Sequence, residues 1–441
     1  MAALFALVFP ARGADTLDWN TNRNQVSADI KSEDLLRMLR RIAAATGWHV
    51  LVEPGTSHNV SAKFNDLAPG EALHLLLGEV NFALVPATNV PSRLFVFRTA
   101  ANQATQLVSP NAPARIMPNE LVVRLKRGVR IEDLARFLGA KVVGRLDKLN
   151  AYRLRFEDPD ATSRARQQLL DNPDVASIEN NFVIDRPETP QTSFANSGLP
   201  QLQLKPPAND GRVIIGLIDT AVQSLGNDLD QVVLKPLSVA GEVQLDPDFP
   251  THGTSMAQTM LRTLQLLGNG SSSVQILPID VYGPNESTST FEVAQGIALA
   301  INKGANPINL SLGSPEDSQV VRDLIAQGSL QGITFYTAKG NTPISTPVFP
   351  AADPGATAVT ALDANGQVVP WANRAALSAV GAPGTVVISF NNQTYLVQGT
   401  SPATAIVSAT AGSLMEKNQI NAVAARNQIL NAPTATTIPG K

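Results

Sequence analysis

Three polar residues in the second half of the chain have the chemistry of a serine hydrolase. Asp219 follows the apolar stretch VIIGLI, and Ser401 lies in GTSPATAIV, a pattern typical of a helix start. His252, in THGTSMAQTM, is the only histidine after position 74. A serine hydroxyl is a weak nucleophile at neutral pH, so it needs a nearby base and a third group that orients the base. These residues supply that set in the order Asp, His, Ser.

Asn341 ends the stretch TFYTAKGN and could add a fourth function. Its side-chain amide could donate to an oxyanion that forms beside Ser401, whose own N–H at a helix start is a second donor. Taken singly, each of these residues has an ordinary structural interpretation as a cap, a turn or a core residue. Together they predict acyl transfer, with Ser401 as nucleophile, His252 as base and Asp219 as the group that orients the base.

The region around these residues alternates apolar strands with amphipathic helices. The stretches VIIGLIDT, VQILPIDVYG and PINLSLGS are typical of buried strands, and FEVAQGIALAINKGA has helical spacing. Such alternation predicts a parallel sheet with helices on both faces. Reactive groups of these sheets collect at the carboxyl ends of the strands, where Asp219 and Asn341 are expected.

The motifs LIDTAV, HGTSMA, SLGS, AKGN and GTSPA occur in the order found in subtilisin-like serine peptidases (subtilases), which the chain resembles from 205 to about 415. The resemblance implies an α/β fold with a parallel sheet between helices, and serine endopeptidase activity. It implies a catalytic triad of Asp219, His252 and Ser401, with Asn341 as oxyanion donor. It also implies two substrate-binding segments, made of Ser311, Leu312 and Gly313 and of Ala338, Lys339 and Gly340.

Several positions depart from the family pattern without removing a catalytic atom. Ala221 and Gln258 stand where the family has glycine, Pro402 replaces a methionine after the nucleophile, and Ala405 replaces a proline. Pro402 suits a first helical turn, which needs no N–H there. Lys339 replaces a small apolar residue near the expected specificity pocket. If the Lys339 side chain points into the pocket, it would select acidic or small substrate side chains. The interpretation that we favour is that it points outward as a surface lysine.

These departures leave a second function open, a catalytically weak or inactive binding or signalling protein of the cell envelope. A serine esterase is disfavoured, because Ser401 lies in GTSPA and not in a GxSxG turn. The resemblance allows calcium, with Asp228 and Asp230 as candidate ligands. The sequence has no EF-hand loop and no dense carboxylate cluster, so we assign no metal and no cofactor.

Two small α+β domains are expected before the catalytic region. Residues 24–99 contain two strand-helix-strand patterns and resemble the secretin and TonB short N-terminal domain, which implies a cell-envelope partner. Residues 116–187 have the order βαββαβ, which predicts a ferredoxin-like fold, and resemble a fervidolysin-type propeptide. That resemblance implies a zymogen whose propeptide domain guides folding, inhibits the enzyme intramolecularly and is removed. A permanent accessory domain is the alternative.

The remaining segments are expected to connect these domains. Residues 100–115 have linker composition, 188–204 form a Pro-rich region suited to processing, and 205–441 form the catalytic domain. Residues 1–14 have a short apolar run followed by small residues, a pattern typical of the end of a signal peptide. We therefore expect a secreted or periplasmic protein. No later apolar run predicts a membrane span.

Composition excludes several classes of function. The chain of 441 residues has no cysteine, which rules out disulfides, thiolate zinc sites and thiol nucleophiles. Its formal net charge of -3 offers no electrostatic basis for binding nucleic acid or an anionic membrane. The resemblance to subtilases implies a protein or peptide substrate as a partner.

Overall fold

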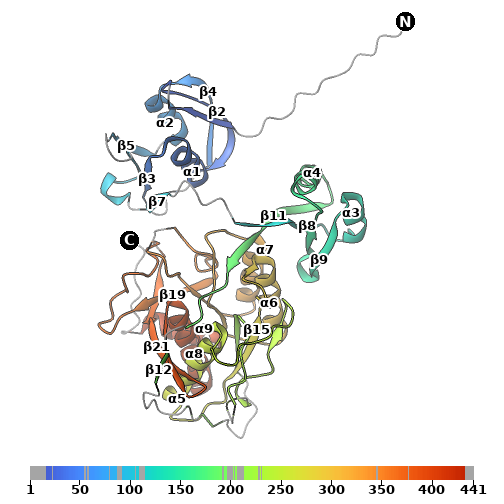
Figure 1. The fold of residues 1–441 in the computed structure, drawn as a ribbon, viewed down its shortest axis with the longest axis vertical. Helices are drawn as coiled ribbons and strands as arrows, with labels where there is room; N and C mark the ends of the chain where they lie inside the picture. Colours follow the sequence, from blue (N-terminus) through green and yellow to red (C-terminus); the bar gives the residue numbers. More distant parts are fainter. Residues whose placement is uncertain are drawn as a thin grey trace. The chain divides into compact units, whose positions relative to one another are not determined.

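The computed structural model describes most of the chain, in two compact units divided between residues 113 and 114 (Figure 1). The signal-like residues 1–14, together with Asp228 and Asp230, lie outside the described residues. The described ranges are 16–21, 23–53, 56, 59–78, 80–86, 92–104, 106–108, 115–190, 193–195, 202, 204–205, 213–226, 229, 231–343, 346–375 and 377–432.

The described residues of the first unit form two small sheets and two α-helices. An antiparallel sheet has the order β1 (Thr16–Asn20), β2 (Gln25–Asp34), β4 (Asn59–Leu67). A mixed sheet has the order β5 (Asn81–Val85), β6 (Arg93–Phe97), β3 (His49–Val52), β7 (Gln106–Val108). The helices are α1 (Leu35–Thr46) and α2 (Pro69–Leu77), and η1 (Ala101–Gln103) precedes β7. Helix α1 contributes apolar side chains at helical spacing to the core of this unit: Leu35, Met38, Leu39 and Ile42.

This unit extends beyond the range 24–99 at both ends. Strand β1 precedes the range, and β7 pairs antiparallel with β3 inside the segment 100–115 that we expected to be a linker. Val108 of β7 is 4% exposed and belongs to the same core. A strand of three residues is too short to show a period of two in the sequence, so the pairing could not be predicted.

The second unit begins with a ferredoxin-like βαββαβ domain, as its pattern predicted. Its elements are β8 (Ile116–Leu125), α3 (Ile131–Leu138), β9 (Lys141–Leu146), β10 (Ala151–Arg155), α4 (Pro159–Leu170) and β11 (Val175–Asp185). The sheet order is β11-β8-β10-β9, and every pairing in it is antiparallel. The end of β11 also pairs with β16 (Ser287–Ser289) of the larger domain, so the two domains of this unit share a sheet.

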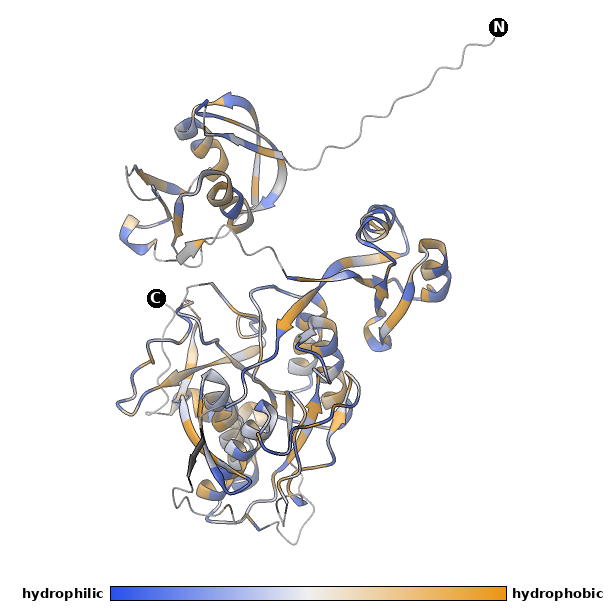
Figure 2. Ribbon diagram, viewed as in Figure 1, coloured by the Kyte–Doolittle hydropathy of each residue, from blue (hydrophilic) through white to orange (hydrophobic). Residues whose placement is uncertain are grey.

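The larger domain is built on seven parallel strands. Their order is β14 (Leu237–Ser238), β15 (Gln275–Asp280), β13 (Ile214–Asp219), β17 (Ile308–Leu310), β18 (Phe335–Ala338), β19 (Ala356–Leu362) and β20 (Ala379–Pro383). The apolar residues of these strands are buried, and Figure 2 draws several of the strands in the orange of hydrophobic residues. Such strands need cover on both faces, which the sequence pattern predicted.

Helices cover both faces of this sheet. On one face α6 (Thr290–Asn302) and α7 (Gln319–Leu330) pack with Ile218 of β13. On the other, α5 (His252–Leu267) and α8 (Thr400–Asn418) pack with Ile215 and Leu217 of the same strand, and α9 (Ala422–Asn431) lies against α8. A hairpin of β21 (Thr385–Phe390) and β22 (Gln393–Gln398) leads into α8. Within the described residues, no helix has the length and apolarity to cross a membrane.

Candidate active site

Asp219 and His252 form a buried hydrogen-bonded pair. Asp219 is the last residue of β13, and His252 is the first residue of α5. Nδ1 of His252 lies 2.8 Å from Oδ1 and 3.0 Å from Oδ2 of Asp219. The two side chains are 7% and 1% exposed. A carboxylate at Nδ1 selects the tautomer with its hydrogen on Nδ1, which leaves the lone pair on Nε2 available to a proton.

Gly253 allows the start of α5 to approach the end of β13. A Cβ atom at this position would lie 2.2 Å from the carbonyl oxygen of Thr220, and the Gly253 N–H donates to Thr220 Oγ1 at 2.8 Å. The hydroxyl of Thr251 caps the helix by accepting from Thr254 N at 3.0 Å. A larger residue at position 253 would move the helix, and with it the imidazole of His252, away from Asp219.

Ser401 is the second residue of α8 and is 7% exposed. Its hydroxyl donates to the carbonyl oxygen of Ser311 at 3.3 Å, and the hydroxyl of Ser311 donates to the carbonyl oxygen of Ser401 at 3.3 Å. Pro402 stands in the first helical turn, where a backbone N–H has no helical acceptor, so it costs no helical hydrogen bond. These contacts hold Ser401 against the residue that follows β17.

Asn341 lies beside the start of α8 with its amide in a fixed orientation. Its Oδ1 accepts from the backbone N of Thr400 at 2.8 Å and from Thr400 Oγ1 at 2.9 Å. Both bonds use the oxygen, so the Nδ2 group keeps its hydrogens for another acceptor. A Cβ atom on Gly399, whose φ is 153°, would lie 3.1 Å from this Nδ2. The arrangement can supply an oxyanion donor one residue away from Ser401.

The two segments expected to bind substrate follow neighbouring parallel strands. Ser311 to Gly313 follow β17, whose Leu310 is paired with Thr337 of β18. Ala338 ends β18, and Lys339 and Gly340 come directly after it. Since Leu310 also pairs with Ile218, next to Asp219, the structure brings both segments to the edge of the sheet that carries the acidic residue. Their role in holding a substrate stays a prediction.

Lys339 is not the surface residue that we favoured. The residue is only 5% exposed, and its Nζ donates to the carbonyl oxygen of Leu377 at 3.2 Å. Burial lowers the pKa of Lys339 from its usual value near 10.5, and the positive charge of Arg374 lowers it further. The exposure was mispredicted because the covering loop follows β19, far away in the sequence.

Replacing Lys339 by methionine should change how stability depends on pH. The folded protein releases the Lys339 proton at a lower pH than the unfolded chain does, so the free energy of unfolding of the parent rises as the pH rises through the lowered pKa toward 10.5. A tenfold difference in proton affinity between the two states corresponds to about 1.4 kcal/mol. Urea unfolding of Ser401→Ala protein, with and without Lys339→Met, at pH 7.5 and pH 10.5 measures this rise. Equal pH dependence in both proteins would contradict the assignment.

Gln258, which the sequence left without a role, connects two elements of the site. The residue is 5% exposed, and its Oε1 accepts from the backbone N of Ser389 in β21 at 3.2 Å. Arg262, one turn further along α5, donates to the hydroxyl of Ser389 at 3.4 Å. A glycine at position 258 could not make the first contact. The helix that begins with His252 is therefore bonded to the hairpin that leads to Ser401.

A hollow beside His252 is lined by the chain that leaves the ferredoxin-like domain. Residues 185–190 form one wall, and Glu286 and residues 396–398 form the others. Two hydrogen bonds hold the main chain of this segment in place. Tyr282 Oη donates to the carbonyl oxygen of Asp185 at 3.0 Å, and Arg186 N donates to the carbonyl oxygen of Glu286 at 3.1 Å. The end of the small domain thus lies next to the candidate base.

Two side chains of β11 cap helices of the larger domain, a contact that sequence reasoning missed. Glu179 accepts from Gln319 N at 2.6 Å and from Val320 N at 3.3 Å at the start of α7. Asn181 accepts from Phe291 N at 3.1 Å at the start of α6. Burial raises the pKa of Glu179, and its hydrogen bonds oppose that rise. Acidic and amide side chains suit helix N-termini, but the helices they cap are far away in the sequence.

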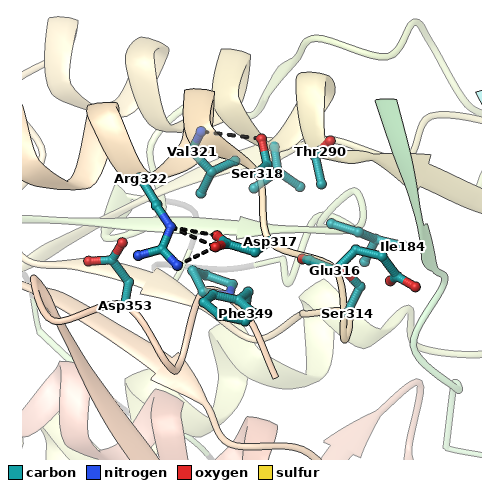
Figure 3. Close-up of a pocket in the computed structure, with 12 residues that line it drawn as sticks. Ile184, Thr290, Ser314, Glu316, Asp317, Ser318, Val321, Arg322, Phe349 and Asp353 are labelled. Atoms are coloured by element: carbon teal, nitrogen blue, oxygen red, sulfur yellow. Dashed lines mark hydrogen bonds and ion pairs between the residues drawn. The ribbon is translucent and has the colours of Figure 1, made fainter. Parts of the chain in front are cut away.

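A small pocket where β11 meets α6 and α7 was also missed. Figure 3 shows the ion pair of Arg322 with Asp317 near Phe349, and the guanidinium of Arg322 lies 5.1 Å from the centre of that ring. Ile184 of β11 contributes to the opposite side of the lining. The walls come from several distant segments, so no local motif marks the pocket. Its remaining lining residues include Thr290, Val293, Ser314 and Val321.

Among the described residues, no three His, Cys, Asp or Glu side chains are grouped closely enough to hold a metal ion. The candidate calcium ligands Asp228 and Asp230 are outside that set, so the calcium implied by the resemblance is untested.

Models of known protein families match two regions of the chain. A model described as the subtilase family matches residues 210–438, and one described as the fervidolysin N-terminal prodomain matches residues 102–181. Subtilisin Savinase from Lederbergia lenta is 30% identical over 210 residues, which cover 45% of this chain and 78% of that protein. An alkaline protease from Shouchella clausii is 30% identical over 210 residues, which cover 45% of this chain and only 55% of that protein.

Solved structures show the same fold. Fervidolysin from Fervidobacterium pennivorans matches with a TM-score of 0.54 at 17% identity, over 70% of this chain and 56% of that one. The epidermin leader peptide processing serine protease from Staphylococcus aureus matches with a TM-score of 0.53 at 16% identity, over 71% of this chain and 91% of that one. At these identities the likeness concerns the fold.

Proposed function

The chain belongs to the subtilase family of serine endopeptidases, and we propose that it is made as a secreted or periplasmic zymogen that hydrolyses peptide bonds through Asp219, His252 and Ser401. The observation that carries this proposal is the buried contact of His252 Nδ1 with Asp219 at 2.8 Å, which leaves Nε2 free to act as a base.

In the proposed reaction, Ser401 Oγ bonds to the substrate carbonyl carbon and its proton passes to Nε2 of His252. In this proposal the Ser401 hydroxyl gives up its hydrogen bond to the Ser311 carbonyl oxygen as substrate binds, and donates to Nε2 of His252 instead. Catalytic hydrogen bonds of this kind commonly form or shorten only when substrate is bound. Asn341 Nδ2 and the Ser401 N–H hold the oxyanion. His252 then returns the proton to the leaving amine as the C–N bond breaks. Water, deprotonated by the same ring, releases the acyl group from Ser401.

We assign residues 116–187 the role of an intramolecular inhibitor. Support comes from the prodomain match, from the helix caps made by Glu179 and Asn181, and from the wall that residues 185–190 form beside His252. A segment held beside His252 blocks the site from other peptides. Processing is proposed between 186 and 204. Residues 24–99 are proposed to bind a cell-envelope protein, on their resemblance to the secretin and TonB short N-terminal domain.

A serine-directed phosphonate probe tests the proposed nucleophile, with mass spectrometry of the incubated protein as a second readout. We expect the parent protein to be labelled at Ser401 and to lose its N-terminal region by a cut between 186 and 204. Ser401→Ala protein should remain full length and unlabelled.

Ser311→Ala is a matched control, because it changes a neighbouring hydroxyl that the mechanism does not use as a nucleophile. Labelling that survives in Ser401→Ala would contradict the proposal. So would a parent protein that stays full length and unlabelled under all conditions.

A further inference from the structure

A short strand, formed by residues that follow the wall of the hollow beside His252, pairs with the hairpin that leads to Ser401. Strand β12 (Ser193–Ala195) pairs antiparallel with β22, with Ser193 opposite Tyr395 and Ala195 opposite Gln393 (Figure 1). β22 in turn pairs with β21 on its other side. The three strands form a small sheet of order β12-β22-β21, in which β12 takes the outer edge.

The turn of the hairpin determines which main-chain groups of β22 face this edge. Asn391 and Asn392 have φ of 47° and 62°, the values of a two-residue type I′ turn, so Phe390 and Gln393 form the hydrogen-bonded pair that closes it. Hydrogen-bonding groups alternate sides along an antiparallel strand. Those of Thr394 therefore face the outer edge, where its register partner is Phe194.

The chain reaches this edge directly from the candidate active site. Residues 183–185 pair with β16, residues 185–190 line the hollow beside His252, and residues 193–195 pair with β22. Only residues 191 and 192 separate the last two segments, and an extended chain covers about 3.3 Å per residue. The chain therefore pairs with β16 before the residues that line the hollow and with β22 after them.

We propose that the outer edge of β22 is a docking edge for the leaving-group side of a polypeptide substrate, which adds to it as an antiparallel strand. In the full chain β12 occupies the edge as a built-in competitor. The inference rests on the proposed endopeptidase function. Strand addition is held by main-chain hydrogen bonds, so this edge selects for a long, extended segment beyond the scissile bond and not for particular side chains.

β12 stays tethered close to the edge after a cut on its N-terminal side. Leu204 is 2% exposed within the core formed by α5 and the hairpin, and Lys205 makes a parallel bridge with Ser271. A tethered strand competes at an effective concentration in the millimolar range. Weakening β12 should therefore improve the binding of long substrates, while substrates too short to reach the edge should be unaffected.

Three quenched fluorescent peptides with one common cleavage sequence test the inference. The short peptide ends two residues after the scissile bond, and the long peptide continues for ten more residues of an extended Ser/Thr/Val sequence. The third peptide is the long one with alternate backbone nitrogens methylated over residues six to ten beyond the bond. The enzymes are the processed parent, Phe194→Pro, which lacks the N–H opposite Thr394, and Phe194→Leu, which keeps it. Rates are normalised by active-site titration.

We expect Phe194→Pro to cleave the long peptide with a kcat/KM about tenfold above that for the short one, as one or two net hydrogen bonds would give. The parent and Phe194→Leu should show a smaller ratio, and methylation should abolish the gain. A ratio of one in all three enzymes, or a gain that survives methylation, would overturn the inference. Failure to cleave any peptide would instead contradict the proposed function itself.

Discussion

Replacing His252 by alanine is expected to lower kcat for a peptide substrate by about six orders of magnitude. The imidazole is the group whose Nδ1 is held by Asp219 at 2.8 Å, so its removal deletes the only proposed acceptor for the Ser401 proton. The fold should survive, because the ring packs at the first residue of α5 and the helix retains its Thr251 cap. Circular dichroism checks the fold, and peptide turnover checks the rate.

Comparison with Ser401→Ala makes the His252 prediction sharper. Groups that act as a unit lose their function together, so the double variant His252→Ala, Ser401→Ala should be no slower than either single variant. All three proteins should also stay unprocessed in mass spectrometry. If the His252→Ala protein still cut itself, or if the two substitutions reduced the rate additively, His252 would not be the base for Ser401.

Asp219→Asn is expected to lower kcat by about four orders of magnitude with little change in the fold. Oδ1 of Asp219 accepts from Thr220 N at 2.7 Å, so an asparagine that keeps its oxygen there places its amide nitrogen at the Oδ2 position, 3.0 Å from Nδ1. An amide donor at this distance favours the ring that accepts at Nδ1 and carries its hydrogen on Nε2. A ring with its hydrogen on Nε2 cannot take the Ser401 proton.

Asp280→Asn is the matched control for this prediction. Asp280 stands opposite Asp219 in the register of β15 and β13 and is 3% exposed, and its carboxylate accepts from Tyr282 N at 2.9 Å and Gly283 N at 3.0 Å. Neither of these bonds involves His252. Peptide turnover should fall by far less in Asp280→Asn than in Asp219→Asn. Equal losses of turnover would show that the effect of Asp219→Asn arises from replacing any buried carboxylate at these strand ends, and not from the contact with His252.

The strands that position the candidate site could be predicted because their signal is local. Apolar strands that end in a polar residue indicate a parallel sheet, and the carboxyl ends of parallel strands meet at one edge. Asp219 and Ala338 follow that rule directly. The same reasoning predicted the βαββαβ order of 116–187, because each helix and strand there has its own period.

Features that depend on contacts between distant segments could not be predicted in this way. The burial of Lys339 depends on Leu377, and the caps on α6 and α7 come from β11 more than a hundred residues earlier. Strands β7 and β12 have three residues each, too few to show a periodic pattern. In each case the sequence shows a residue type that is compatible with several environments, and only the folded chain selects one of them.

Gln258 restrains two elements of the candidate site against each other, although the proposed reaction does not use its side chain. Through Ser389 N, at 3.2 Å, its side chain ties the helix that carries His252 to the hairpin whose second strand ends three residues before Ser401. This bond restrains the separation of the helix and the hairpin, and with it the separation of the proposed proton acceptor and the proposed nucleophile that they carry.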